Sequence, residues 1–297
     1  MIVKIKGDFV YESKTKNTEK GRSDMGKISY GLRGHDIADN FSDMCIKAKE
    51  NGIKKLQFAL AKTCNNIDFD AIGYDKNISS EISEELERNM LDTAVLGCYI
   101  NPIDTVVDEK QTQLRRFENF ISYAKDLKAH VIGTETGWKN TLEETHSADT
   151  YLEFLKAMEP LVKKAEDMNV QIGIEPVWYY SIYSVEVMEK MLKDISSRNI
   201  SVIFDVSNLI YPGNFEAQDN IISSAFDKFG DRISTIHLKD FYMKDGIKTF
   251  APAGLGHLNT EMLLKNICDM TEKPDIILDE LPLTLYNETI ERLNAML

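Results

Sequence analysis

Several features that define particular protein classes are scarce or absent in this chain. It has only four cysteines, which lie far apart and form no C-x-x-C pair: Cys45, Cys64, Cys98 and Cys268. This usage is typical of a cytoplasmic protein with reduced, mostly buried thiols. No apolar run approaches the ~18 residues of a membrane span, and the N-terminus lacks the apolar segment of a signal peptide. We therefore expect no membrane association and no export signal.

Basic residues are also in short supply. Lysine and arginine total 35 against 48 aspartates and glutamates, so the formal net charge is −13. Proteins that grip nucleic-acid phosphates usually carry the opposite sign. The composition therefore argues against a nucleic-acid partner, and the surplus of acid is accounted for by solubility.

What the chain has instead is a regular alternation of short apolar runs and amphipathic stretches. Eight runs have the length of strands buried on both faces: 27–32, 54–60, 93–100, 129–135, 170–176, 200–206, 233–239 and 275–281. The first turn, GLRGHDIADN, lacks the G-x-G-x-x-G of a dinucleotide-binding sheet. The pattern predicts an α/β fold, a single (β/α)8 TIM barrel over residues 27–297. Residues 1–26 form a short N-terminal extension, either a hairpin or an arm.

Four consecutive predicted strands each end in a side chain that can bind metal. They supply Glu175, Asp205, His237 and Glu280. Strand ends meet at the C-terminal rim of a barrel, where three carboxylates would repel one another unless a divalent cation offset their charge. Three oxygens and one imidazole favour Mn²⁺, Mg²⁺ or Co²⁺, although Zn²⁺ also accepts such ligands. The alternative is that each acid is separately paired or solvated at the rim.

The sequence resembles the xylose isomerase-like TIM-barrel superfamily in the order and spacing of five short segments. These are IGIEP, FDVSN, IHLKD, GLGHLNTEMLL and ILDE. The similarity covers roughly residues 27–297 and is strongest after residue 170. It implies a sugar or sugar-phosphate isomerase or epimerase that holds one metal ion with Glu175, Asp205, His237 and Glu280. It also implies that Glu175 and Glu280 move a proton on opposite faces of a small carbohydrate substrate, through an enediolate that the metal stabilises.

The chain departs from this family at Asn208. The family often has Asp-x-x-His after the sixth strand, whereas this chain has Asp205-Val206-Ser207-Asn208. An asparagine amide can bond a sugar hydroxyl but cannot act as a base. With only five histidines in the chain, this change counts against the multi-zinc site of an AP endonuclease.

Further candidates for substrate contact stand at other predicted strand ends and in a glycine-rich loop. Each has a structural alternative, such as a surface salt bridge, a backbone turn or core packing. The candidates are Lys239, His257, Trp138, Glu135 and His35.

Two other enzyme classes and one binding function stay open at this point. A lyase of the inosose dehydratase kind shares the first deprotonation step, and a phosphodiesterase of the AP-endonuclease kind shares the fold. A non-catalytic sugar-binding barrel would not require both Glu175 and Glu280. The sequence leaves the oligomeric state open, a homo-oligomer included.

Overall fold

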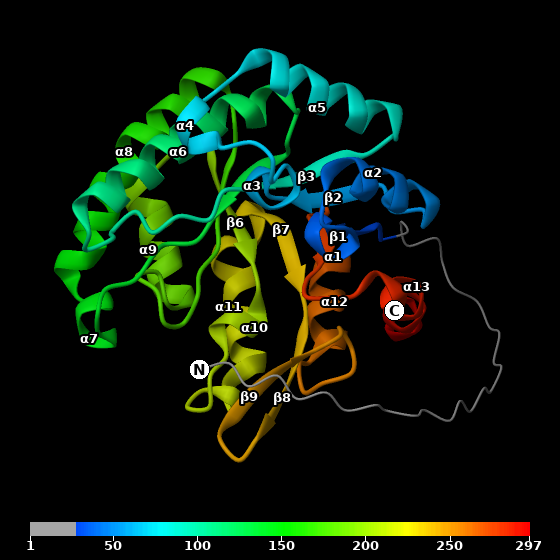
Figure 1. The fold of residues 1–297 in the computed structure, drawn as a ribbon. Coiled ribbons are helices and arrows are strands. Elements are labelled where there is room, and N and C mark those ends of the chain that lie inside the picture. Colours follow the sequence, from blue (N-terminus) through cyan, green and yellow to red (C-terminus); the bar gives the residue numbers. More distant parts are fainter. Residues whose placement is uncertain (1–27) are drawn as a thin grey trace.

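The computed structural model describes residues 28–297, so the predicted extension over residues 1–26 lies outside the described residues. Within the described part, the eight apolar runs all become strands of one closed parallel barrel (Figure 1). The order around the barrel is β1-β10-β7-β6-β5-β4-β3-β2, and β1 closes it by pairing with both β10 and β2. The strands are β1 (Tyr30–Arg33), β2 (Lys55–Phe58), β3 (Asp92–Gly97), β4 (Val131–Thr134), β5 (Ile172–Ile174), β6 (Ile200–Phe204), β7 (Ile233–Leu238) and β10 (Asp275–Leu278). The TIM-barrel prediction is confirmed.

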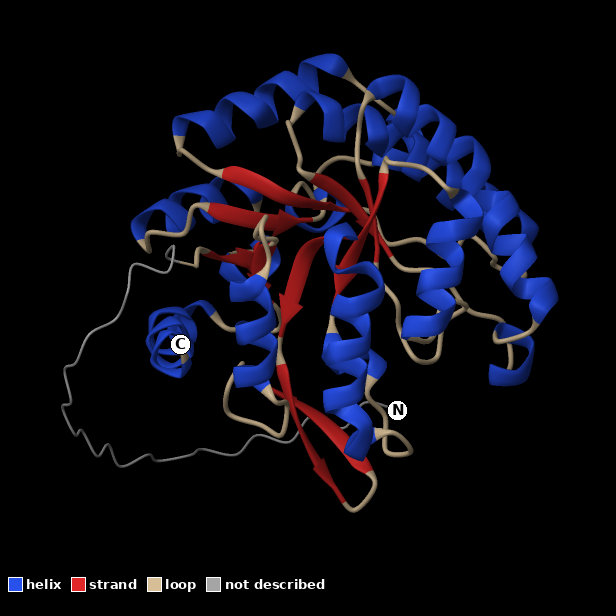
Figure 2. Cartoon of the chain, turned by 180° about the vertical axis from the view of Figure 1, so that it is seen from behind, coloured by secondary structure: helices blue, strands red, loops and turns tan. Residues whose placement is uncertain are grey.

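Helices surround the strands on the outside, as both ribbon views show (Figure 2). The longer ones are α2 (Phe41–Glu50), α5 (Lys76–Arg88), α6 (Val107–Asp126), α8 (Ala148–Met168), α9 (Val185–Ile195), α11 (Gln218–Phe229), α12 (Thr260–Asp269) and α13 (Tyr286–Met296). Short helical turns are α1 (Gly34–Ile37), α3 (Leu60–Thr63), α4 (Phe69–Ile72), α7 (Leu142–Thr145) and α10 (Val206–Leu209), with 3-10 turns at Phe215–Ala217, Gly230–Arg232 and Leu283–Leu285. No helix among the described residues is long and apolar enough to cross a membrane. All four cysteines are free thiols, and three of them are buried.

The interior of the barrel is closed by a small apolar layer. It is made of Ala94, Val95, Val131, Ile203 and Ile277. Ile203 can reach the middle because β4 and β5 carry glycine there: a Cβ on Gly133 or Gly173 would lie 2.8 or 2.7 Å from its side chain. The layer is therefore a packed floor, and the polar residues above it are held at the C-terminal mouth.

A two-stranded hairpin projects from the barrel after β7 (Figure 1). It comprises β8 (Asp240–Lys244) and β9 (Ile247–Ala251). Asp245 and Gly246 form its turn with φ angles of 51° and 73°, and two consecutive positive φ angles suit the type I′ turn of a two-residue hairpin. An Asp-Gly pair between two runs rich in apolar and aromatic residues is a sequence signal for a hairpin. The prediction of eight strands did not include this hairpin.

A cluster of charges ties the strands together at the other end of the barrel. Asp275, at the start of β10, lies 2.5 Å from Nδ1 of His130 across the barrel and also pairs with Lys55. Nε2 of His130 lies 3.1 Å from Asp92. The hydrogen bond to Asp275 raises the pKa of His130. Burial alone would raise the pKa of Asp275, but His130 and Lys55 outweigh it and lower that pKa.

Asp275→Asn should lower the free energy of unfolding by about 1–3 kcal/mol, reduced from the value for a fully buried pair because His130 and Lys55 are partly exposed. The raised pKa of His130 gives stability that is complete below about pH 6.5 and lost as the pH rises through the folded value. The lowered pKa of Asp275 gives stability that is complete above about pH 3.9 and lost as the pH falls through its folded value. Urea unfolding should therefore show a larger loss at pH 5.5 than at pH 8.5. Asp92→Asn, whose side chain is 46% exposed, is the comparison and should cost less stability than Asp275→Asn at both pH values.

Candidate metal centre and active site

The alternation of side chains along the strands decides which residues face the barrel mouth. Gly173 of β5, Ile203 of β6 and Ile277 of β10 contribute to the packed interior. Side chains two residues further along a strand direction point to the same face. Glu175, Asp205 and Asp279 therefore face the mouth directly above this layer.

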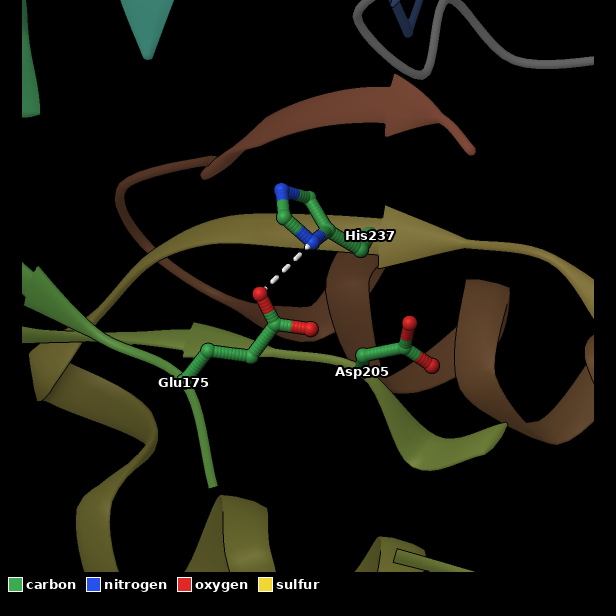
Figure 3. A group of neighbouring side chains, drawn as sticks. All are labelled: Glu175, Asp205 and His237. Atoms are coloured by element: carbon green, nitrogen blue, oxygen red, sulfur yellow. Dashed lines mark ion pairs between the residues drawn. The ribbon is translucent and has the colours of Figure 1, made fainter. Parts of the chain in front are cut away.

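Three of the predicted ligands meet there. Glu175, Asp205 and His237 are all buried, and one ligand atom from each lies within 4.8 Å of the others. Figure 3 shows the three side chains at neighbouring strand ends, with Glu175 and His237 pointing toward each other and Asp205 beside them. Oε2 of Glu175 lies 3.2 Å from Nδ1 of His237. Two carboxylates and an imidazole so close together form a donor set suited to a divalent cation.

The structure does not bring Glu280, the fourth predicted ligand, into this cluster. Glu280 is exposed at the rim, and the chain turns there with a φ of 51°. The buried carboxylate at the end of β10 is Asp279, one residue earlier. The physical reason is the two-residue period of a strand, since a shift of one residue reverses the face of a side chain.

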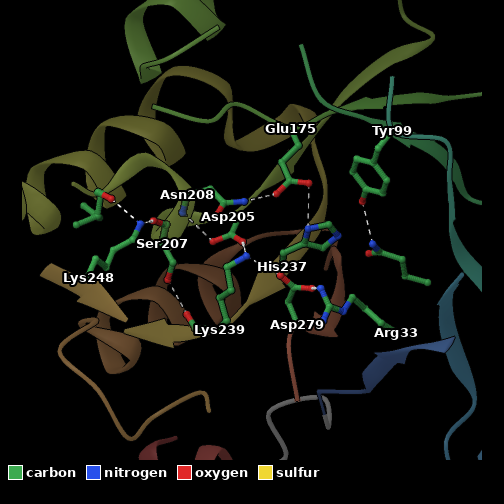
Figure 4. Close-up of polar contacts among 12 residues, drawn as sticks. Arg33, Tyr99, Glu175, Asp205, Ser207, Asn208, His237, Lys239, Lys248 and Asp279 are labelled. Carbon is green, nitrogen blue, oxygen red and sulfur yellow. Dashed lines mark hydrogen bonds and ion pairs between the residues drawn. The ribbon is translucent and has the colours of Figure 1, made fainter. Parts of the chain in front are cut away.

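Asp279 belongs to a network of buried charges beside the triad (Figure 4). Lys239 places its Nζ 2.6 Å from Oδ2 of Asp279 and 3.0 Å from Oδ2 of Asp205, and Arg33 lies 2.7 Å from Oδ1 of Asp279. Burial alone would raise the pKa of Asp279, but the cations around it hold that pKa well below its usual range. Burial alone would lower the pKa of Lys239, but Asp205 and Asp279 outweigh it and raise that pKa. Both groups are therefore charged at neutral pH.

Unsatisfied atoms in the triad fit a bound cation. Among the described residues, Nε2 of His237 and Oδ2 of Asp205 are buried without a hydrogen bond, although that oxygen has Lys239 as an ion-pair partner. Burial raises the pKa of Asp205 to about 6. The pKa stays raised even with Lys239 beside the carboxylate, so burial is only partly compensated, and a divalent cation is a standard way to offset the remaining cost.

A cavity of about 460 Å³ opens above the triad at the mouth. Four of the residues predicted to contact substrate line it: Glu135, Asn208, Lys239 and His35. Arg33, which ends the first strand beside His35, also lines it, and further wall residues had no sequence signal for substrate contact: Gln57, Lys62, Tyr99, Tyr179 and Phe250. A larger open hollow of about 1040 Å³ lies at the opposite end of the barrel around Arg198, Arg232 and Lys273. The smaller cavity is the candidate site because Glu175 and His237 of the triad line it.

Asn208 positions Glu175. Its Nδ2 donates a 2.7 Å hydrogen bond to Oε1 of Glu175, and its backbone N–H donates to Asp205 (Figure 4). Asp205 thereby caps the short helix α10 and holds Asn208 over the triad. Asn208 thus contacts a candidate ligand directly, in addition to lining the cavity.

Glu135 stands on the β4 side of the cavity. Its carboxylate is hydrogen-bonded to Tyr180, and burial together with the charge of Glu175 raises its pKa to about 7. Tyr180 stacks on Trp138 with ring centroids 5.2 Å apart, and Asn101 holds both the N–H and the C=O of Trp138. Trp138 is 48% exposed and is not on the cavity wall of the described residues, so it supports Tyr180.

His257 lies away from the cavity wall of the described residues. It is exposed, and its Nδ1 accepts a hydrogen bond from the backbone N–H of Met243 in the hairpin. The neighbouring glycine-rich loop is held by Asp240, whose carboxylate accepts N–H groups of Gly254, Gly256 and Leu258. This arrangement gives His257 and Asp240 a structural role.

The sequence model of one family, described as xylose isomerase-like TIM barrel, matches residues 45–296. The chain belongs to this family. No functionally curated protein is similar enough in sequence to match the chain. Membership agrees with the closed barrel and with the buried acidic and imidazole groups at its mouth.

Solved structures of family-like barrels superpose over most of the chain. A D-tagatose 3-epimerase-like protein is 15% identical, with a TM-score of 0.69 over 90% of this chain and 99% of that one. The probable 3-DHS dehydratase AsbF from Bacillus anthracis is 15% identical, with a TM-score of 0.69 over 91% and 98%. The IOLI protein, solved with a zinc atom, is 13% identical, with a TM-score of 0.65 over 91% and 96%. At these identities the likeness establishes the fold.

Proposed function

We propose that this chain is a divalent-metal-dependent isomerase or epimerase of a sugar, a sugar phosphate or a related polyol-like carbonyl compound. The observation that carries the proposal is the buried triad of Glu175, Asp205 and His237 under an open cavity of about 460 Å³. A cavity of this size suits a small molecule. Family-like barrels that contain zinc or magnesium, and one described as epimerase-like, support the assignment.

The proposed roles follow from the contacts. Glu175, Asp205 and His237 hold the cation, which when bound supplies Lewis-acid help to a carbonyl or hydroxyl oxygen. Asn208 fixes the orientation of the Glu175 carboxylate through the 2.7 Å hydrogen bond. Arg33 and Lys239 present positive charge to the cavity and suit hydroxyl, carboxylate or phosphate oxygens.

Proton transfer needs a carboxylate that is not already neutralised. Among the described residues that line the cavity, Glu135 and Glu280 are the carboxylates without an ion-pair partner. We propose Glu135 as the partner of Glu175 in moving the proton, because it is inside the cavity and its pKa of about 7 suits acid–base work near neutrality. Glu280 at the rim is the alternative that the sequence motif implies.

A lyase of the dehydratase kind is the second candidate. The observation that favours it is that the probable 3-DHS dehydratase and the D-tagatose 3-epimerase-like protein are equally similar to this chain in structure, each with a TM-score of 0.69. Its first step, removal of a proton beside a carbonyl, would use the same residues. The two reactions diverge only when a hydroxyl leaves.

The test is to incubate Mn²⁺-, Mg²⁺-, Co²⁺- and Zn²⁺-loaded protein in D₂O with ketoses, ketose phosphates, inososes and 3-dehydroshikimate. An isomerase or epimerase should give an isomeric product that carries deuterium at the reacting carbon, detected by proton NMR. Loss of water would move the assignment to the lyase. Turnover without deuterium exchange would exclude proton transfer by exchangeable carboxylates, and no turnover of any compound by any metal form would count against both.

A further inference from the structure

The third buried carboxylate of the mouth, Asp279, has different partners from the three groups of the triad. We infer that Asp279 is bound by Lys239 and Arg33 rather than by the metal, so that the ammonium of Lys239 is a permanent second cation beside a three-ligand metal centre. This inference rests on the proposed function, since it concerns the same site. It assigns Asp279 as a positioning residue and Lys239 as a group that faces the substrate.

Both oxygens of Asp279 are already engaged. Oδ2 lies 2.6 Å from Nζ of Lys239, and Oδ1 lies 2.7 Å from the guanidinium of Arg33. The described residues bring Glu175, Asp205 and His237 within 4.8 Å of one another without Asp279. An aspartate is one methylene shorter than a glutamate, so Asp279 has less reach toward the shared point than Glu175 has.

Several neighbouring residues hold Lys239 in the site. Its backbone oxygen accepts a 2.7 Å hydrogen bond from Ser207, and its Nζ lies 4.6 Å from the ring centre of Phe250 in the hairpin. The residue is only 4% exposed. Burying an ammonium is costly without partners, and Asp205 and Asp279 are those partners. The ammonium therefore stays at the wall of the cavity.

The charges explain how the site folds before a cation binds. Three carboxylates, Glu175, Asp205 and Asp279, face the two full cations Lys239 and Arg33, with His237 beside Glu175. Without Lys239 the carboxylates would repel one another strongly in a buried place. Lys239 offsets part of this negative charge, and Arg33, which also pairs with Asp36, offsets less than a full charge of it, so negative charge remains for a metal to neutralise.

Lys239 and the metal then share one ligand. Oδ2 of Asp205 lies 3.0 Å from the ammonium, so a bound divalent cation has a positive charge as its neighbour. This repulsion lowers the affinity for metal. Because Lys239 and Arg33 hold Asp279, a bound metal would keep room for a substrate oxygen, which the ammonium could contact at the same time.

The test is Mn²⁺ binding to the purified full chain, measured by calorimetry on five variants and the wild type. Asp279→Asn should weaken binding by less than about tenfold, whereas Asp205→Asn should weaken it by at least about 100-fold. Lys239→Met should tighten binding by at least about tenfold, because the repelling charge is removed and Asp279 is released to bind the metal. The double variant Lys239→Met/Asp279→Asn should lose most of that gain. Glu280→Gln is the matched control at the next residue and should leave the affinity unchanged.

The outcomes separate this inference from the proposed function. Equal loss of Mn²⁺ binding in Asp279→Asn and Asp205→Asn would make Asp279 a ligand and overturn the inference alone. Weaker binding by a folded Lys239→Met protein would do the same. If Lys239→Met does not fold, Lys239→Gln replaces it, and the comparison of Asp279→Asn with Asp205→Asn decides by itself. A wild-type protein that binds neither Mn²⁺ nor Zn²⁺ would overturn the metal centre and the proposed function with it.

Discussion

Replacement of Asp205 by asparagine is expected to reduce Mn²⁺ affinity by at least about 100-fold, which exceeds the usual effect of changing a residue outside the ligand set. Asp205 is completely buried and faces the other two ligands from the end of β6. Asparagine keeps the shape and removes the charge. It is also a good N-cap residue, so the bond to the N–H of Asn208 that begins α10 can persist. The variant should therefore fold, and calorimetric titration should show the loss.

Two further variants complete this prediction. His237→Ala should weaken binding in the same way, because it removes the single imidazole of the triad. Asp231→Asn is the matched control, since Asp231 is exposed at the opposite end of the barrel. Full Mn²⁺ affinity in both Asp205→Asn and His237→Ala would mean that the cation binds elsewhere.

The second large effect concerns Glu135. With a substrate in hand, Glu135→Gln is expected to lower kcat and the rate of solvent deuterium exchange by about 10²–10⁴. The glutamine keeps the shape and the contact with Tyr180 but cannot carry the proton. Because Glu135 lies outside the triad, Mn²⁺ affinity should stay within a few-fold of wild type.

Glu175 and Glu280 provide the comparison for this experiment. Glu175→Gln should lose both activity and metal affinity, since Glu175 is a triad member. Glu280→Gln should keep most of its activity because the side chain is exposed at the rim. Fully active Glu135→Gln together with inactive, metal-replete Glu280→Gln would return the proton-transfer role to Glu280.

The sequence predicted the barrel well because each strand is a short run buried on both faces. All eight predicted runs became barrel strands, and three of the predicted ligands meet. The spacing of Glu175, Asp205 and His237 follows the strand–helix repeat, which sequence reasoning can count. The apolar runs therefore show where each strand ends and which polar residues follow it.

The same runs do not reveal which side chains face inward. In Ile276-Ile277-Leu278-Asp279-Glu280 both faces are apolar, so the pattern alone does not separate Asp279 from Glu280. The packing of Ile277 in the barrel interior settles the matter in favour of Asp279. The contact between Lys239 and Asp279 joins the ends of two neighbouring strands. No pattern of nearby residues in the sequence predicts this pairing.

The most direct test of the metal centre is a crystal structure of the protein grown or soaked with Mn²⁺, with anomalous data collected to locate the ion. The account predicts one anomalous peak per chain, about 2.0–2.6 Å from ligand atoms of Glu175, Asp205 and His237. An Mn²⁺-containing crystal with no peak among these three side chains, or with its peak at another place in the barrel, would contradict it.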